Sequence, residues 1–84
     1  MIDFREGDLV RVEWQTFHGG VQHLRQTGRL PQGDLALVTR VFRNHAWNND
    51  PTLVVVVFPE PGWLGKPLNM DPRKLELVSE ALLQ

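Results

Sequence analysis

The stretch that decides the fold is Thr52 to Phe58, TLVVVVF, which holds six consecutive apolar residues from Leu53 onward. Its four adjacent valines are branched at Cβ, which restricts χ1 and favours a pleated backbone, so the sequence predicts a β-strand here. Side chains of a strand alternate between its two faces, so both faces need cover, one from the core and the other from the chain's own tail or from a partner. The two apolar rows are Val54, Val56 and Phe58 on one face and Leu53, Val55 and Val57 on the other.

The composition bounds the class of protein. With 84 residues the chain has room for one domain, residues 1–84, with a small core. The sequence contains no cysteine, which excludes disulfides, thiolate metal sites and thiol nucleophiles and suits a reducing compartment. The N-terminus carries acidic residues, and no apolar run approaches the ~20 residues of a membrane helix. We therefore expect a cytoplasmic protein that neither crosses a membrane nor is secreted by a signal peptide.

The charge of the chain argues against avid, nonspecific binding of phosphates. The formal net charge is −1, whereas such binding needs an excess of Lys and Arg. Residues 21–49 nevertheless carry a net charge of +3, while the segments on either side are acidic. A solvated face is the plain interpretation of this imbalance, and a contact with an acidic partner is the other. The arginines of this segment are Arg25, Arg29, Arg40 and Arg43.

Two further strands are predicted before the valine stretch. Residues 9–14, LVRVEW, alternate apolar and charged side chains, which is the pattern of a strand with one solvated face. This phase places Trp14 in the core together with the valines of that strand. Residues 34–42, DLALVTRVF, form the next strand. Because neither of its two faces is purely apolar, we expect a bulge or bend near Thr39.

Three segments read as loops. Residues 15–33 show no hydrophobic period and are rich in Gly, Gln and Thr, so we expect a long, partly ordered loop that is functional or holds a small hairpin. The turn-rich connector 43–51 should carry Trp47 at its tip, and the loop 59–65 contains Trp63. Large rings are seldom left in water without a reason. These two tryptophans either fold back as lids on the ends of the fold or anchor a partner.

The last part of the sequence predicts two short strands separated by one helical turn. Residues 66–70, KPLNM, and 75–78, LELV, are the strands. Between them, Asp71 suits an N-cap and the proline that follows it suits the first helical position. Ser79 is placed to cap a final turn over 80–84, which requires Leu82 and Leu83 to be docked.

In this order, five short strands with a long loop after the first and a one-turn helix before the last resemble an SH3-like β-barrel. The phrase GDLVRV at 7–12 resembles the first strand of that family, and LNMDPRKLELV at 68–78 resembles its strand, helical turn and closing strand. The phrase GDLALVTRV at 33–41 is similar to the KOW strand of the nucleic-acid-binding branch. The pattern also resembles small SH3-like proteins that bacteriophages encode, which implies the host cytoplasm or the virion as the location. The absence of tyrosine disfavours the branch that binds proline-rich peptides.

No residue pattern indicates catalysis. The single serine, Ser79, lacks the setting of an activated nucleophile. The three histidines, His18, His23 and His45, lack the spacing of a metal site, and only His45 with Asp50 offers a remaining acid-base pair. We therefore expect no enzyme, no cofactor, no metal and no small-molecule substrate.

The favoured function is a non-catalytic protein-binding module or assembly subunit, with a protein partner or a second copy as its ligand. The alternative is a KOW-like nucleic-acid-binding module that uses the four arginines of the basic segment and nearby aromatic rings. For the favoured function, the expected contact residues are Trp47, Trp63, Phe17, His18, Leu24, Arg25, Val55 and Val57.

Overall fold

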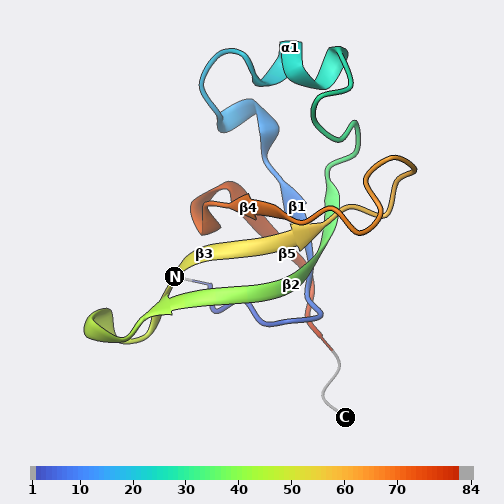
Figure 1. Ribbon diagram of the computed structural model, residues 1–84. Coiled ribbons are helices and arrows are strands. Elements are labelled where there is room, and N and C mark those ends of the chain that lie inside the picture. Colours follow the sequence, from blue (N-terminus) through green and yellow to red (C-terminus); the bar gives the residue numbers. More distant parts are fainter. Residues whose placement is uncertain (1, 82–84) are drawn as a thin grey trace.

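Five antiparallel strands form one sheet, and short helical segments lie in the connections between them (Figure 1). The computed structural model describes residues 2–81. The strands are β1 (Leu9–Val12), β2 (Leu35–Asn44), β3 (Asp50–Val57), β4 (Leu68–Met70) and β5 (Leu75–Ser79), and their order across the sheet is β4-β3-β2-β1-β5. The helical segments are α1 (Val21–Gln26) and the 3-10 turns η1 (Trp14–Thr16), η2 (His45–Trp47) and η3 (Pro72–Lys74). The predicted all-β class is confirmed.

The valine stretch forms most of β3, which pairs with β2 on one side and with β4 on the other. Its inner row, Val54, Val56 and the following Phe58, is buried as predicted. The strand begins two residues earlier than predicted and includes Pro51, which lies beyond the part of β3 that β4 covers. A proline is compatible with this end of the strand because β4 does not reach it, so no ladder on that side needs its missing N–H.

A bulge in β2 sets which side chains of this strand face the core. The register between β2 and β3 shifts between Val38 and Arg40, which leaves Thr39 as the extra residue and confirms the predicted bulge. Val38 and Val41 consequently both pack toward the core, and Arg40 and Phe42 are exposed. The Thr39 hydroxyl donates to the Val55 carbonyl at 3.2 Å and thereby closes the gap in the ladder.

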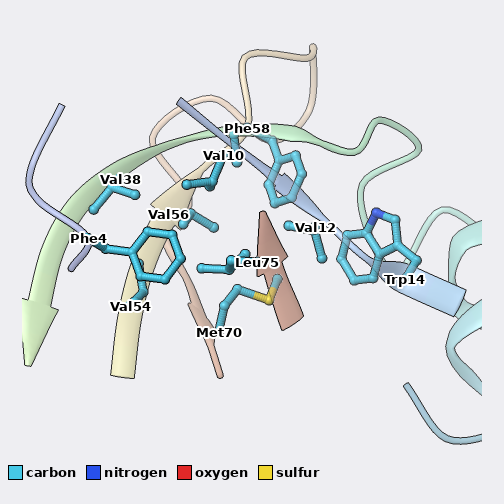
Figure 2. Close-up of a cluster of buried hydrophobic side chains, with 11 residues drawn as sticks. Phe4, Val10, Val12, Trp14, Val38, Val54, Val56, Phe58, Met70 and Leu75 are labelled. Atoms are coloured by element: carbon cyan, nitrogen blue, oxygen red, sulfur yellow. The ribbon is translucent and has the colours of Figure 1, made fainter. Parts of the chain in front are cut away.

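The core lies on the inner side of the sheet, where side chains from all five strands and from the N-terminal segment point toward one another (Figure 2). Trp14 is 4% exposed, and its ring lies 5.9 Å from that of Phe58 and 5.8 Å from that of Phe17. Its Nε1 donates to the Gly33 carbonyl at 3.0 Å. The sequence pattern predicts a first strand that extends to Trp14, but β1 ends at Val12 because Trp14 begins the 3-10 turn η1. Between them, the Glu13 N–H still donates to the Lys74 carbonyl at 2.9 Å, in register with the β1–β5 pairing. The predicted core position of Trp14 is confirmed.

The prediction of an irregular loop over residues 15–33 is wrong in one respect, because this segment contains the helix α1. The helix follows Gly20, which has a φ of +104°, and ends at Gln26, with Thr27 as its C-cap. Its six residues include no fully buried side chain, so an apolar stripe was not there to be recognised. A helix this short depends on its surroundings. No helix within residues 2–81 is long and apolar enough to cross a membrane.

Asp8 ties the two ends of the described chain together. It is 2% exposed, and its carboxylate accepts from the Arg5 N–H at 2.8 Å and from the Ala81 N–H at 2.7 Å. Gly7 precedes it with a φ of +92°, and a Cβ at that position would lie 3.1 Å from the Ala81 methyl group. The turn therefore needs glycine both for its backbone conformation and for the close approach of Ala81.

The C-terminal elements follow the prediction closely. η3 is the expected single turn, and the Asp71 side chain caps it by accepting from the Arg73 N–H at 2.9 Å. β4 begins at Leu68 rather than at residue 66, after Pro67, whose nitrogen cannot donate to a ladder. Ser79 is the last residue of β5, and residues 80 and 81 after it are not helical. The rest of the predicted final turn, with the docking of Leu82 and Leu83, lies outside the described residues.

Replacing Asp71 by alanine is expected to lower the free energy of unfolding by about 1 kcal/mol, the usual contribution of an N-cap side chain. The hydrogen bonds from Arg73 hold the pKa of the Asp71 carboxyl below its ordinary value of 3.8. The stabilisation is therefore present above that value and is lost as the pH falls through the folded-state pKa. Urea unfolding at neutral and strongly acidic pH checks this, and the gap between the two proteins should narrow in acid. Asp71→Ser, which keeps a capping oxygen, should recover most of the neutral-pH stability; an equal gap at both pH values contradicts the ionic contribution.

Candidate functional site

The sheet turns a second apolar surface away from the core. Three of its members form one row across the strands, because Leu37 pairs with Leu9 of β1 and with Val57 of β3. Phe42 and Leu53 form a second pair further along β2 and β3. A solvated strand face ordinarily carries polar side chains, so this surface departs from the usual pattern. We name it the outer apolar face and define it by Leu9, Leu35, Leu37, Phe42, Leu53, Val55 and Val57.

The predicted outer row of β3 is only half covered. Leu53, Val55 and Val57 are all half-buried, so they are neither hidden by the rest of the chain nor bare in solvent. Their neighbours on β2 are more open, with exposed fractions of 38% for Leu35, 44% for Leu37 and 40% for Phe42. The surface available for contact therefore extends from β3 onto β2, beyond the two valines that the sequence singled out.

A groove lies at one end of the outer apolar face, where β3 runs into the loop 59–67. Its volume is about 400 Å³. Leu64, on this loop, forms part of its wall and is 67% exposed. The complete lining, which includes no charged residue, is Leu9, Ala36, Leu37, Val57, Phe58, Pro59, Leu64 and Gly65. We call this the apolar groove.

Trp47 lies at the tip of the hairpin between β2 and β3, as predicted, and is 69% exposed. Hydrogen bonds order this tip, because the Asn44 side chain accepts from the Ala46 N–H at 3.0 Å and the Asn44 carbonyl accepts from the Asn49 N–H at 3.1 Å. Asn48 and Asn49 have φ values of 58° and 62°, a backbone region that asparagine tolerates better than most residues. The indole is thus presented to solvent by a folded turn.

Trp63 folds back onto the core, which is the first of the two roles predicted for the loop tryptophans. It is half-buried and packs against the core, and the Lys66 ammonium lies 5.7 Å from its ring centroid. Its loop is joined to residues 32 and 33 by Glu60, whose carboxylate accepts from the Gln32 and Gly33 N–H groups at 3.1 and 2.8 Å. Trp63 is therefore a lid on the core, and Leu64 is the exposed apolar residue of this loop.

The candidate residues of the segment 15–33 are used mainly within the protein. Phe17 packs on Trp14, and Leu24 is half-buried. The Arg25 guanidinium lies 5.3 Å from the Trp14 ring centroid and donates to the carbonyls of Pro31 and Gln32. His18 is exposed. These residues lie at the α1 end of the molecule and Trp47 at the opposite end, so the fold does not bring them together (Figure 1).

The four arginines do not gather into one basic patch. Arg25 and the exposed Arg29 belong to the α1 segment, whereas Arg40 and Arg43 lie on β2, which runs away from it (Figure 1). Arg43 is held by Asp3 and by the Phe4 carbonyl, both at 2.6 Å. The Arg40 guanidinium lies 4.6 Å from the ring centroid of Phe42.

The chain matches no protein-family model, no curated protein and no solved structure. Within residues 2–81, no three His, Cys, Asp or Glu side chains are grouped so that they could hold a metal ion. Function is therefore inferred from the exposed apolar surfaces of the molecule itself.

Proposed function

We propose that this chain is a small non-catalytic protein-binding module or assembly subunit with an SH3-like barrel fold. It acts in the cytoplasm, which for a phage-encoded protein means the host cytoplasm or the virion. It binds through its outer apolar face and the exposed Trp47. The fold part of this proposal is supported by the five-stranded antiparallel sheet and by the one-turn helix η3 directly before β5. Both features belong to the pattern through which the sequence resembles that family.

The observation that carries the functional part is the concentration of exposed apolar side chains on one side of the sheet. Leu35, Leu37 and Phe42 are each between 38% and 44% exposed, and Leu64 at the rim of the apolar groove is 67% exposed. Contiguous apolar surface of this kind marks contact sites in soluble proteins and otherwise promotes aggregation. Between Leu35 and Phe42 on β2 and between Leu53 and Val57 on β3, Arg40 carries the single formal charge among the outward positions, and its guanidinium lies over Phe42. This surface therefore suits an apolar protein surface better than a polyanion.

The structure offers few unpaired guanidinium groups for the KOW-like, nucleic-acid-binding alternative. A nucleic acid would need several arginines on one surface with their guanidinium groups available to phosphates. Arg25 and Arg43 already donate to oxygen atoms within the chain, and they lie toward opposite ends of it. In a gel-shift assay at low ionic strength, a labelled single-stranded RNA or DNA should therefore migrate with the protein as it migrates alone. A shift that weakens steeply with added salt would favour the alternative.

Leu37→Glu is expected to weaken partner binding at least roughly tenfold, because it places a charge in the middle of the contact row. The side chain is 44% exposed, so the substitution should leave the fold intact. The measurement is capture from a native lysate on immobilised wild type and variant, with quantification of each retained protein. Ile2→Glu is the matched control, since Ile2 is also 44% exposed but belongs to the N-terminal segment and not to the outer apolar face. The proposed surface is contradicted if every protein that the wild type retains is retained equally by Leu37→Glu.

A further inference from the structure

We infer that the apolar groove receives Trp47 of a second copy of the same chain, so that copies associate tip into groove. This inference rests on the proposed function and names its partner. Trp47 and the apolar groove lie at opposite ends of the β2–β3 pair (Figure 1). The contact therefore joins two different surfaces, which gives a chain or a ring of subunits rather than a closed symmetric pair.

The groove has the size and chemistry for a large apolar ring. Its volume of about 400 Å³ lies within the range of pockets that hold small ligands, about 300–1,000 Å³, and an indole is smaller than most such ligands. Its walls are the side chains of Leu37, Val57 and Leu64 together with Pro59, and none of its lining residues is charged. An occupant with a formal charge would be disfavoured there. The N–H of an inserted indole has to stay at the open side of the groove or donate to a backbone carbonyl.

The hairpin tip supplies such a ring. Residues 44–49, NHAWNN, contain no acidic residue and no Lys or Arg, so insertion of Trp47 into the groove buries no formal charge while His45 is neutral. The tip is already ordered by the hydrogen bonds of Asn44, which reduces the entropy lost on binding. Tryptophan is also among the residues that contribute most to protein contacts.

Trp47 cannot occupy the groove of its own chain. The eight residues of β3 separate the two sites, and at about 3.3 Å per residue a strand of that length spans roughly 26 Å. A second copy is the occupant that the molecule itself provides, because each copy carries both the exposed ring and the neutral groove.

The area of this contact predicts a weak association. With 69% of Trp47 exposed, the ring contributes roughly 150 Å², given that a buried aromatic side chain covers about 150–250 Å². A stable interface buries about 800 Å² per partner, so the indole provides about a fifth of what a tight contact needs. Association should therefore depend strongly on protein concentration and appear toward the millimolar range.

Sedimentation velocity of single variants and of their mixture tests this arrangement. Wild type should sediment faster as its concentration rises. Trp47→Ala and Leu64→Asp should each remain monomeric, with the dissociation constant raised at least tenfold, because one lacks the tip and the other carries a charge in the groove. Both residues are more than 60% exposed, so neither change should disturb folding. An equimolar mixture of the two variants should form dimers and nothing larger, since Trp47→Ala keeps an intact groove and Leu64→Asp keeps an intact tip.

Phe42→Glu separates this arrangement from two outer faces stacked on each other. Phe42 is exposed on the outer apolar face but does not line the groove, so tip-into-groove association should survive this change. Loss of association in Phe42→Glu, a mixture that stays monomeric, or a Trp47→Ala protein that still associates would each overturn the inference. A wild type that stays monomeric at all concentrations would also overturn it. The proposed binding of another protein is then judged separately by the captures with Leu37→Glu.

Discussion

Replacing Trp14 by alanine is expected to lower the free energy of unfolding by about 4 kcal/mol, in the range found when a buried aromatic side chain is removed. A chain of 84 residues has a total stability of roughly 4–13 kcal/mol, so this single change removes a large part of it. The ring is 4% exposed and packs against two other aromatic rings, those of Phe17 and Phe58. Its loss leaves a cavity that these rigid neighbours cannot fill completely.

The same substitution should loosen the segment 15–33 more than the sheet. Trp14 contacts this segment at three points, by packing against the Phe17 ring, by lying beneath Arg25 and by donating to the Gly33 carbonyl. Amide hydrogen exchange should therefore accelerate at Leu24 and Thr27 beyond the change expected from global unfolding, whereas Val54 and Val56 should follow the global change. Urea unfolding provides the global value.

Trp14→Phe is the control that keeps an aromatic ring but removes the N–H donor to Gly33. It should cost about 1–2 kcal/mol, from one hydrogen bond and a smaller loss of packing. An alanine variant no less stable than the phenylalanine variant would show that the ring's packing contributes little, contrary to its burial. Uniform exchange across the chain would show that Trp14 does not anchor the segment 15–33.

Predictions from the sequence succeeded where the pattern is local. The four valines of β3 are branched at Cβ and favour an extended backbone. Asp71 followed by Pro72 is a sufficient signal for a capped helical turn. The bulge at Thr39 was predictable because apolar residues on both sides of β2 do not fit one uninterrupted strand. In each case the deciding information lies within a few residues.

The helix α1, the role of Arg25 and the burial of Trp63 depend on contacts between distant residues, which no local sequence pattern shows. α1 spans under two turns and has no buried side chain, so no periodicity indicates it. Arg25 was a candidate contact residue because it is basic and lies in a loop, but the fold uses it to join Trp14 to residues 31 and 32. Trp63 packs against the core whereas Trp47 does not, and its loop is held by the hydrogen bonds of Glu60 to residues 32 and 33, which the sequence does not show.

The candidate surface was recognised only in part. Val55 and Val57 were predicted contact residues because their strand has two apolar faces, and both lie on the outer apolar face. Leu35 and Leu37 carry the same signal on β2, where apolar residues also occupy both faces, but on that strand the pattern predicts a bulge and does not by itself indicate a contact surface. Leu64 has no sequence signal of exposure, since only the folded loop shows which of its two apolar residues turns outward.

The buried carboxylate of Asp8 should give the second large loss of stability. Asp8→Ala is expected to lower the free energy of unfolding by about 3 kcal/mol, because a hydrogen bond to a charged group contributes about 1.5–3 kcal/mol and this carboxylate accepts two. The estimate lies at the lower end of the sum for two such bonds, about 3–6 kcal/mol, because Arg5 is exposed and Ala81 is half-buried, so water can reach both freed N–H groups. Urea unfolding measures the loss.

The position of those two bonds makes the prediction specific. They link the N-terminal segment to the chain after β5, so Asp8→Ala should raise hydrogen exchange first at the amides of Arg5 and Ala81. Asp8→Asn keeps one acceptor oxygen but turns an NH₂ group toward the other donor, so it should recover only part of the stability. Asp3→Ala is the control for the loss of a carboxylate nearby, since Asp3 is largely exposed and its ion pair with Arg43 should contribute at most about 1 kcal/mol. An Asp8→Ala protein as stable as Asp3→Ala, or with unchanged exchange at Ala81, would mean that this carboxylate does not hold the two segments together.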